Sequence, residues 1–306
     1  MAERLRAILD VDTGIDDALA LALAVRSPEV ELVAVTTVAG NVPLSHTTEN
    51  TLRVLAALGA GDVPVHRGCS RPLARALEDA HDVHGDTGLG GYELPAAARD
   101  AEKPSAPEFL VDHIMSHPGE ITLVCTGPLT NLAVALSLEP TLPSAVRRLV
   151  LMGGSLGPGN VTPYAEFNIY VDPEAAAQVF AAFPLTMVGL DVTQQTLLTR
   201  SAWERLAALD SPVARLVYGV CGHTFTARGK DSFVLHDPLA LGVALDPTLC
   251  AVRRGAIHVE TATAWCAGDT ALTEQEDGPH AVAVGVDAPR FLRLFAETLG
   301  LPDLTE

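Results

Sequence analysis

Positive charge is scarce in this 306-residue sequence. Lysine and arginine together number 20 against 38 aspartates and glutamates, which gives a formal net charge of -18 at pH 7. Nucleic acids and anionic membrane surfaces are recognised by basic faces, so this composition argues against both as partners. The charge favours a small neutral molecule or a cation as the ligand.

Cysteine is sparse as well, and its five positions are scattered along the chain. The number is odd and no two cysteines have the C-x-x-C spacing, so we predict neither a disulfide framework nor a zinc site. No apolar run reaches the length of a membrane span, and no signal-type apolar segment follows Met1. We therefore expect a cytoplasmic protein without a membrane partner.

The sequence does contain a regular alternation of two patterns. Short apolar runs, such as 31–38, 121–125 and 149–152, alternate with longer Ala- and Leu-rich helical patterns. This order predicts parallel strands joined by crossover helices. Hydrophobic residues make up 48% of the chain, enough for a large core, and no linker or repeat divides it. We predict one α/β domain over residues 1–306, with a mostly parallel, Rossmann-like open sheet flanked by helices.

Four aspartates are crowded at the first predicted strand-to-helix turn. An apolar run ends at Asp10, and a helical pattern begins near Ile15. Asp16 and Asp17 have a structural explanation, because acidic residues in a first helical turn interact favourably with the helix dipole. Asp10 and Asp12 have no such explanation, and like charges this close repel one another unless something neutralises them. A hard divalent cation with oxygen ligands is the natural counter-ion, so the stretch predicts a cation site.

Glycine-rich polar turns follow three further predicted strands. They lie at 39–41, 125–128 and 152–154. In an open parallel sheet, ligands bind beyond the carboxyl ends of the strands, so we expect these turns to face one site. Glycines that close tight turns would explain any one of them alone.

Two long segments lack a helical or strand pattern. Residues 78–95 are rich in glycine and contain His84, and a loop of this length in a compact domain is typical of a lid. Residues 158–170 offer hydrogen-bonding side chains that suit sugar hydroxyls, although an Asx-rich surface loop has the same composition. Further along, Asp237 precedes Pro238, and this pair is explained as the N-cap and first turn of a helix.

Two other enzyme classes share part of these patterns. Residues 8–13 match the apolar D-x-D-x-T opening of the haloacid-dehalogenase-type phosphatases, which use Mg2+. That chemistry also needs a lysine at the end of a strand followed by an acidic pair, and neither Lys103 nor Lys230, the only lysines, is placed so. Residues 153–157 match the G-x-S-x-G of a nucleophile elbow, but Pro158 follows where a helix would have to begin.

Taken together, the motifs resemble those of the nucleoside hydrolases, the family of inosine-uridine preferring nucleoside N-ribohydrolases. The opening D-x-D-x-G-x-D-D at 10–17 is the first of eight ordered matches, and the others lie at 40–41, 84–91, 126–131, 152–154, 159–170, 172–175 and 236–238. One departure is Thr13, where the family more often has proline. This difference should alter the rigidity of the turn more than its chemistry.

The resemblance implies Ca2+-dependent hydrolysis of the N-glycosidic bond of a ribonucleoside to ribose and free base, through an oxocarbenium-like ribosyl group. The implied metal ligands are the carboxylates of Asp12, Asp17 and Asp237 and the backbone carbonyl of Thr126. Asp12 is also implied as the general base for the attacking water, and His236 as the acid or hydrogen-bond partner of the departing base. The other implied substrate contacts are Asp16, Asn41, His84, Met152, Asn160, Glu166, Phe167 and Asn168.

Several points stay open at the level of sequence. A nucleoside- or ribose-binding protein that lacks catalysis is the alternative function. Phe225, Arg228 and Phe233 are candidates for the base pocket, although the phenylalanines could equally be core residues, and none of the three indicates a purine or pyrimidine preference. Asp10 is expected to orient its neighbours. Members of the family are commonly dimeric or tetrameric, so we expect a homodimer or homotetramer.

Overall fold

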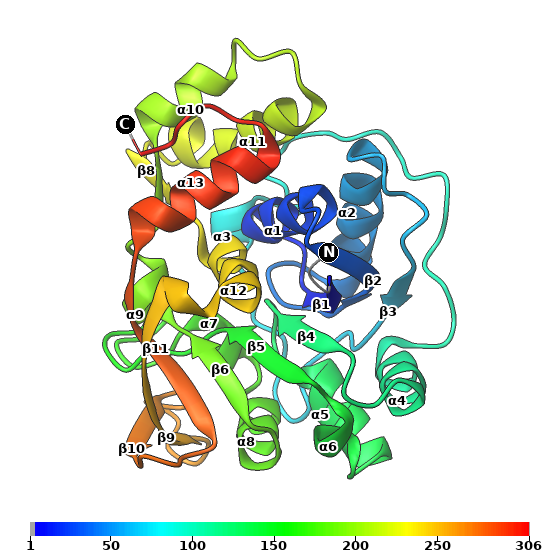
Figure 1. Ribbon diagram of the computed structural model, residues 1–306, viewed down its shortest axis with the longest axis vertical. Coiled ribbons are helices and arrows are strands. Elements are labelled where there is room, and N and C mark those ends of the chain that lie inside the picture. The colour runs from blue at the N-terminus through cyan, green and yellow to red at the C-terminus, as the bar shows by residue number, and fades with distance from the viewer. Residues whose placement is uncertain (1–3, 306) are drawn as a thin grey trace.

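In the computed structural model, which describes residues 4–305, the chain folds around one nine-stranded sheet (Figure 1). Its strands are β1 (Leu5–Val11), β2 (Val30–Thr37), β3 (Val65–Arg67), β4 (Thr122–Cys125), β5 (Arg148–Met152), β6 (Leu185–Val188), β9 (Cys250–Val259), β10 (Thr270–Glu274) and β11 (His280–Val286). Their order is β10-β9-β11-β6-β5-β4-β1-β2-β3. All pairings from β11 to β3 are parallel, and β9 is antiparallel to both of its neighbours.

Helices cover both faces of this sheet. One face packs against α1 (Ile15–Arg26), α12 (His236–Leu245) and α13 (Ala288–Leu299), and the other against α5 (Thr130–Leu138) and α8 (Pro173–Ala182) (Figure 1). The prediction of a mostly parallel α/β sheet flanked by helices is therefore confirmed. The other helices are α2 (Leu44–Ala57), α3 (His81–His84), α4 (Ala106–Ser116), α6 (Leu142–Ala145), α7 (Phe167–Val171), α9 (Leu190–Thr193), α10 (Arg200–Leu206) and α11 (Pro212–Gly222).

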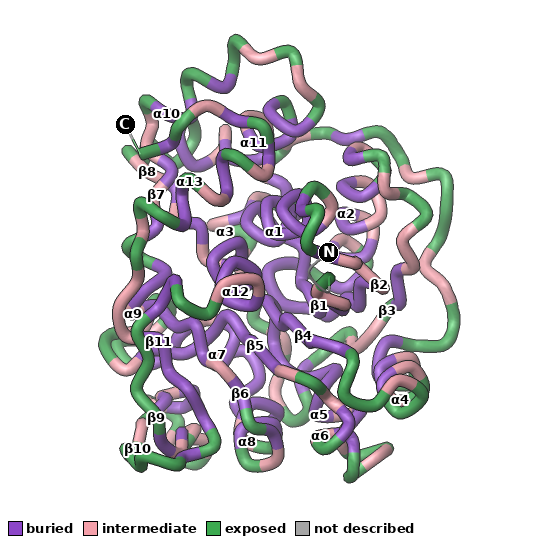
Figure 2. The backbone as a smooth tube through the Cα atoms, viewed as in Figure 1, coloured by how far each residue is buried: buried purple, intermediate pink, exposed green. Residues whose placement is uncertain are grey.

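Strand β1 runs through the middle of the core and leads directly into α1. Successive side chains of a strand point to opposite faces, so Leu9 joins the core beneath α1 and α12 while Ile8 joins the core beneath α5 and α8. Helix α1 is buried without interruption over residues 15–24, as the continuous purple of its tube shows (Figure 2). A helix with no solvated side carries its acidic first turn, Asp16 and Asp17, into the interior.

The observed elements agree with the main pattern and differ in detail. The strands predicted at 31–38, 121–125 and 149–152 are present as β2, β4 and β5, with ends that differ by one residue at most. The prediction that 78–95 has no helix is wrong near the start of this segment, where α3 forms a single turn. The interpretation of Asp237 as an N-cap is also wrong, because α12 begins at His236 and its N-cap is Leu235, two residues before Asp237.

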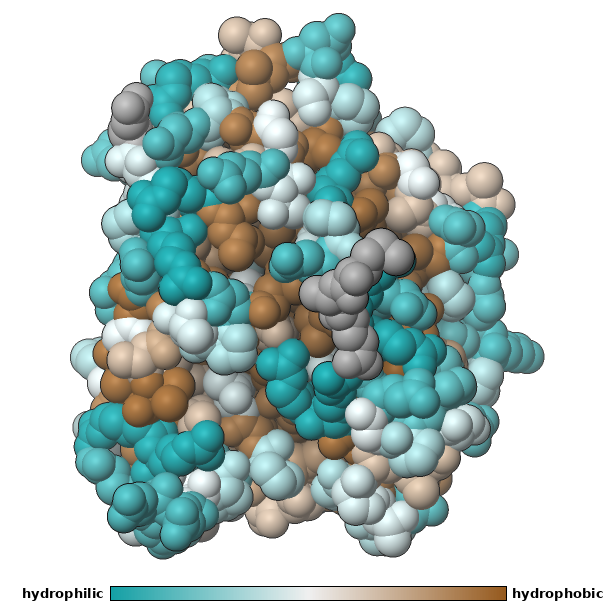
Figure 3. Space-filling view, viewed as in Figure 1, coloured by the Kyte–Doolittle hydropathy of each residue, from teal (hydrophilic) through white to brown (hydrophobic). Residues whose placement is uncertain are grey.

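Polar and apolar side chains are mixed on the face of the molecule that Figure 3 shows, as is usual for a folded chain. Within residues 4–305, no helix combines the length and apolarity that crossing a bilayer requires. Residues 1–3 and 306 of the predicted domain lie outside the described residues.

Candidate active site

A cavity of about 580 Å3 lies at the carboxyl ends of the parallel strands. The chain places β2 on one side of β1 and later places β4 on the other side, so the direction of the topology reverses beside β1. Such a switch point leaves a crevice beyond the strand ends, and ligands bind there in open α/β sheets. The volume is in the range of small-molecule sites.

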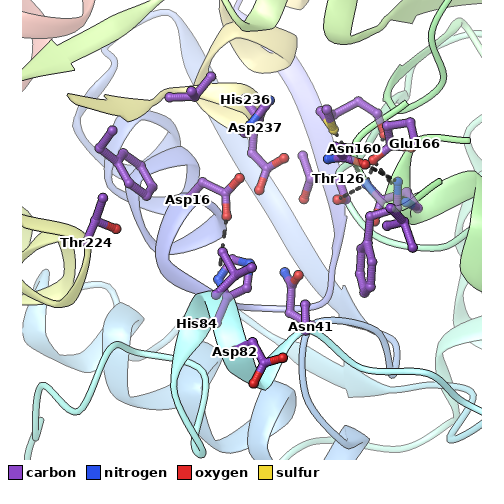
Figure 4. Close-up of a pocket in the computed structure, with 18 of the residues that line it drawn as sticks. Asp16, Asn41, Asp82, His84, Thr126, Asn160, Glu166, Thr224, His236 and Asp237 are labelled. Carbon is purple, nitrogen blue, oxygen red and sulfur yellow. Dashed lines mark hydrogen bonds and ion pairs between the residues drawn. The ribbon is translucent and has the colours of Figure 1, made fainter. Parts of the chain in front are cut away.

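Three buried aspartates meet beside this cavity. Carboxylate oxygens of Asp16, Asp17 and Asp237 all lie within 4.8 Å of one another. Asp16 and Asp17 belong to the first turn of α1, and Asp237 belongs to the first turn of α12. The two helices pack against each other, and Figure 4 shows the Asp16 and Asp237 side chains pointing toward one another from them.

Asp17 and Asp12 are held by the neighbouring turns. The Asp17 carboxylate accepts hydrogen bonds from the Gly14 backbone N–H at 2.9 Å, the Thr126 hydroxyl at 2.8 Å and Asn41 Nδ2 at 3.2 Å. Asp12 Oδ2 accepts from the backbone N–H of Asn41 at 2.6 Å, while Asp12 Oδ1 is buried without a hydrogen-bond partner. The turns after β1, β2 and β4 therefore converge on these two carboxylates.

Electrostatic repulsion is concentrated in this group. Burial is the largest cause that raises the pKa of each of four aspartates, which are Asp12, Asp16, Asp17 and Asp237. Neighbouring carboxylates raise the pKa of Asp12, Asp16 and Asp237 further. The pKa of Asp16 rises to about 8. Asp16 Oδ1, like Asp12 Oδ1, is buried without a hydrogen-bond partner, and its contact with His84 Nδ1, drawn as a dashed line in Figure 4, is 4.0 Å long. A cation among these groups would offset the repulsion and give both oxygens a partner, so the donor set fits a hard divalent ion such as Ca2+.

The three carboxylates that lie closest together differ from the predicted metal ligands at one position. Asp17 and Asp237 belong to the triad of nearby carboxylates, and Asp16, predicted as a sugar contact, completes it. Asp12 is outside that triad but close enough for its charge to raise the pKa of Asp237. Ligation of Ca2+ by Asp12, Asp17, Thr126 and Asp237 stays a prediction.

The side of the cavity across from Asp16 is built at the start of α7 (Figure 4). Glu166 is the N-cap of this helix, and its carboxylate accepts from the backbone N–H groups of Asn168 and Gly154, each at 2.9 Å. Burial raises the pKa of Glu166 to about 7. Asn168 Nδ2 donates to the backbone carbonyls of Thr126 at 2.7 Å and Met152 at 3.1 Å, which ties the ends of β4 and β5 together.

The other predicted sugar contacts lie on the same cavity. Asn160 Oδ1 accepts from the backbone N–H of Phe167 at 2.9 Å, which fixes the loop before α7. All of the predicted substrate contacts line the cavity: Asp16, Asn41, His84, Met152, Asn160, Glu166, Phe167, Asn168 and His236. The structure brings these residues together at one cavity, and their roles as substrate contacts stay predictions.

Two histidines face the same space from different elements. His84 lies at the end of α3 and His236 at the start of α12, and Figure 4 shows them on either side of Asp16. Burial lowers the pKa of His84 to about 3 and that of His236 to about 4. Both rings are therefore neutral near pH 7.

Asp10 is separate from the cavity. Its Oδ1 accepts from the Thr36 hydroxyl at 2.5 Å and from Asn131 Nδ2 at 2.8 Å. Asn131 Nδ2 also donates to the Thr37 carbonyl at 3.0 Å, and its Oδ1 accepts from the Cys69 backbone N–H at 2.8 Å. Asp10 and Asn131 thus join the ends of β1 and β2 to α5, and support the turns that carry the cavity residues.

The sequence revealed only some of the residues that line the rest of the cavity, where the base of a nucleoside would lie. Arg228 and Phe233 line it as anticipated, whereas Phe225 is a core residue stacked on Trp203 with ring centroids 4.7 Å apart. Thr224 also lines the cavity, and its buried hydroxyl has no hydrogen-bond partner. No local pattern marks Thr224, because it lies in an irregular helical turn that the tertiary fold brings to the site. Further lining residues that were missed are Glu78, Asp79, Ala80, Asp82, Val83, Val161, Tyr170, Lys230, Ser232 and Val234.

The fold and the site define an α/β protein with an acidic small-molecule cavity at a topological switch point. A family model described as inosine-uridine preferring nucleoside hydrolase matches residues 7–293. Over 303 residues the chain is 41% identical to a non-specific ribonucleoside hydrolase of Klebsiella pneumoniae (strain 342), with 97% of this chain and 99% of the relative covered. Over 304 residues it is 40% identical to a pyrimidine-specific ribonucleoside hydrolase of Shewanella sp. (strain ANA-3), with 96% of each covered.

Solved structures agree with these relatives. A purine-preferring ribonucleoside hydrolase from Gardnerella vaginalis superposes with a TM-score of 0.91 at 36% identity, over 96% of this chain and 98% of that one. The chain therefore belongs to the inosine-uridine preferring nucleoside hydrolase family, and it is a nucleoside hydrolase. The predicted resemblance is confirmed, and the phosphatase alternative is rejected.

The Asp10–Asn131 pair leads to a prediction about stability. Asn131→Ala removes three hydrogen bonds, two of them fully buried, and leaves the Asp10 carboxylate and the Cys69 N–H without these partners. We expect the free energy of unfolding to fall by about 2 to 4 kcal/mol, measured by urea denaturation. Ser137→Ala, in the same helix, is the control and should change it by less than about 1 kcal/mol. Equal effects of the two substitutions would contradict a supporting role for the pair.

Proposed function

We propose that this chain hydrolyses the N-glycosidic bond of ribonucleosides to ribose and free base in a Ca2+-dependent reaction. The observation that carries the proposal is the group of buried aspartates at the switch point, in which Asp12 and Asp16 each keep an unpartnered carboxylate oxygen. A bound cation and the hydroxyl groups of a sugar would give these two oxygens the partners that the protein does not supply. Membership in the nucleoside hydrolase family supports the same conclusion.

The proposed Ca2+ ligands are the carboxylates of Asp12, Asp17 and Asp237 and the carbonyl of Thr126, and Asp16 is close enough to join them. Bound there, the ion would offset the charge of the cluster, lower the pKa of the attacking water and anchor the ribose 2′ and 3′ hydroxyls.

Asp12 acts as the general base in this proposal. Its Oδ2 is occupied by the amide of Asn41, so Oδ1 is the oxygen available to take a proton from the attacking water. The water oxygen bonds to C1′, the C1′–N bond breaks with its electron pair on the base, and the base gains a proton as it leaves. The surrounding carboxylates stabilise the positive charge that develops on the ribosyl group.

The remaining polar side chains position the two halves of the substrate. Asp16, Asn41, Asn160, Glu166 and Asn168 would hold the ribose hydroxyls. His236 would face the departing base, and its low pKa supports the role of a neutral hydrogen-bond donor over that of a proton-carrying acid.

The base preference is not assigned. The relatives carry names that differ on this point, being pyrimidine-specific, non-specific and purine-preferring. Assembly into a homodimer or homotetramer also stays a prediction.

The direct test of the proposed function is a substrate panel. The protein is incubated with inosine, uridine, cytidine and adenosine in the presence of Ca2+, and free ribose is measured as reducing sugar. We expect release from at least one of them, and much slower release from the matching 2′-deoxynucleoside, because it lacks a hydroxyl for the cluster to bind. Tight binding of a nucleoside without release of ribose would instead support a binding protein.

Substitution of the proposed base gives a second prediction. Asp12→Ala should leave a folded protein whose kcat is lower by about 1,000-fold or more, because no group remains to take the proton of the water. Asp112→Ala, an exposed aspartate on α4, is the matched control and should retain wild-type turnover. Near-normal turnover of Asp12→Ala would rule out the assignment.

Removal of the cation gives a third prediction. Treatment with EGTA should abolish turnover, because the charge of the cluster is then left uncompensated, and added Ca2+ should restore it. The assay is the same release of ribose, with circular dichroism to confirm that the chelated protein stays folded. Activity that survives thorough chelation would show that the cluster works without a metal.

A further inference from the structure

His236 contacts the protein through one ring nitrogen and faces the cavity with the other. Its Nδ1 lies 2.8 Å from Thr193 Oγ1. Its Nε2 has no hydrogen-bond partner among residues 4–305, and it is not one of the unpartnered atoms that are sealed from solvent there. Because His236 lines the cavity, this open nitrogen is available to a ligand.

The hydroxyl group of Thr193 has a single hydrogen-bond partner among the described residues. Thr193 is fully buried at the end of α9, so water does not reach it. In the described part of the chain, His236 Nδ1 is the one hydrogen-bond partner of its Oγ1. A buried hydroxyl that donates to nothing costs free energy, so this hydroxyl donates to Nδ1. If Nδ1 carried a proton instead, the hydroxyl hydrogen would be buried without an acceptor.

We propose that Thr193 is a positioning residue that fixes the tautomer of His236. Its hydroxyl donates to Nδ1, so the neutral ring carries its proton on Nε2 and presents an N–H donor to the departing base. The inference rests on the proposed function, since the base is the ligand that this donor meets. Thr193 itself does not line the cavity and acts through His236 alone.

The second histidine of the cavity shows the same arrangement by a different means. His84 Nδ1 accepts a hydrogen bond from the backbone N–H of Ile15 at 3.0 Å. A backbone amide donates and never accepts through its nitrogen, so His84 Nδ1 has no proton and Nε2 carries it. The cavity thus receives two imidazole N–H donors, one set by the backbone of α1 and one set by a side chain.

Two such donors suit the chemistry of the leaving group. As the C1′–N bond breaks, its electron pair moves onto the base, and negative charge gathers on the ring nitrogens and carbonyl oxygens. A fixed N–H aimed at such an atom stabilises this charge without reorganisation. The proton stays on Nε2 while the C1′–N bond breaks, and the proton that the base gains comes from a water molecule rather than from His236.

Substitution of Thr193 tests the inference through the leaving group. Thr193→Val keeps the shape and removes the hydroxyl, whereas Thr193→Ser keeps the hydroxyl. With the best nucleoside of the panel, we expect the valine variant to lose about 10- to 100-fold in kcat with KM changed by less than about threefold, as when the partner that orients a functional histidine is removed. The serine variant should stay close to wild type.

The control substrate is p-nitrophenyl β-D-ribofuranoside, whose phenolate departs without help from a hydrogen bond. Wild type and both variants should cleave it at rates that agree within about threefold. An equal loss of the valine variant on both substrates would mean that Thr193 is merely structural. Wild-type turnover of nucleosides by the valine variant would overturn the inference as well.

The tautomer is measured independently of turnover. In protein labelled with 15N-histidine, the ring of His236 is assigned by comparison with a His236→Gln variant, and its two nitrogens are distinguished by long-range 1H–15N correlations. We expect a protonated Nε2 and an unprotonated Nδ1 in the wild type, and the opposite result overturns the inference even if the Thr193 variants do not fold. If the wild type cleaves no nucleoside, the proposed function fails while this measurement still decides the tautomer.

Discussion

Burial of like charge at the end of β1 is the constraint on which the rest of the site depends. Helix α1 is apolar on every side, so the core closes around it and carries Asp16 and Asp17 inside. Asp237 arrives from α12, which packs directly against α1. Removing several carboxylates from water costs free energy unless they are paired or hydrogen-bonded, and the hydrogen bonds from the neighbouring turns offset only part of that cost.

The turns around the aspartates are arranged so that they satisfy some of the carboxylate oxygens and leave others free. Asp17 accepts hydrogen bonds from three turns, and Asp12 accepts one from the backbone amide of Asn41. Asp12 and Asp16 each still have one oxygen without a hydrogen bond. Negative charge that the protein does not neutralise therefore faces the cavity. Asn168 donates hydrogen bonds to the carbonyls of two strand ends beside these carboxylates and so fixes their positions. A cation and the hydroxyls of a sugar are ligands of complementary chemistry, which connects the buried charge to the hydrolysis of ribosides.

The sequence predicted the elements whose signals are local. The alternating runs reveal the parallel sheet, and the clustered aspartates reveal the site because both patterns lie within short stretches of chain. Contacts between distant segments leave no such signal, as with Asn131 on Asp10, which are 121 residues apart, and Thr193 on His236, which are 43 apart. The Asp237 N-cap prediction failed for a related reason, since an Asp-Pro pair does not show that the helix already begins at His236.

The assembly of these aspartates around one cation is tested by an anomalous difference map from crystals grown with Ca2+ and ribose. We expect a single strong peak among the carboxylates of Asp12, Asp16, Asp17 and Asp237, in contact with the Thr126 carbonyl and the sugar hydroxyls. A map with no peak there, or with Ca2+ bound only elsewhere, would contradict it.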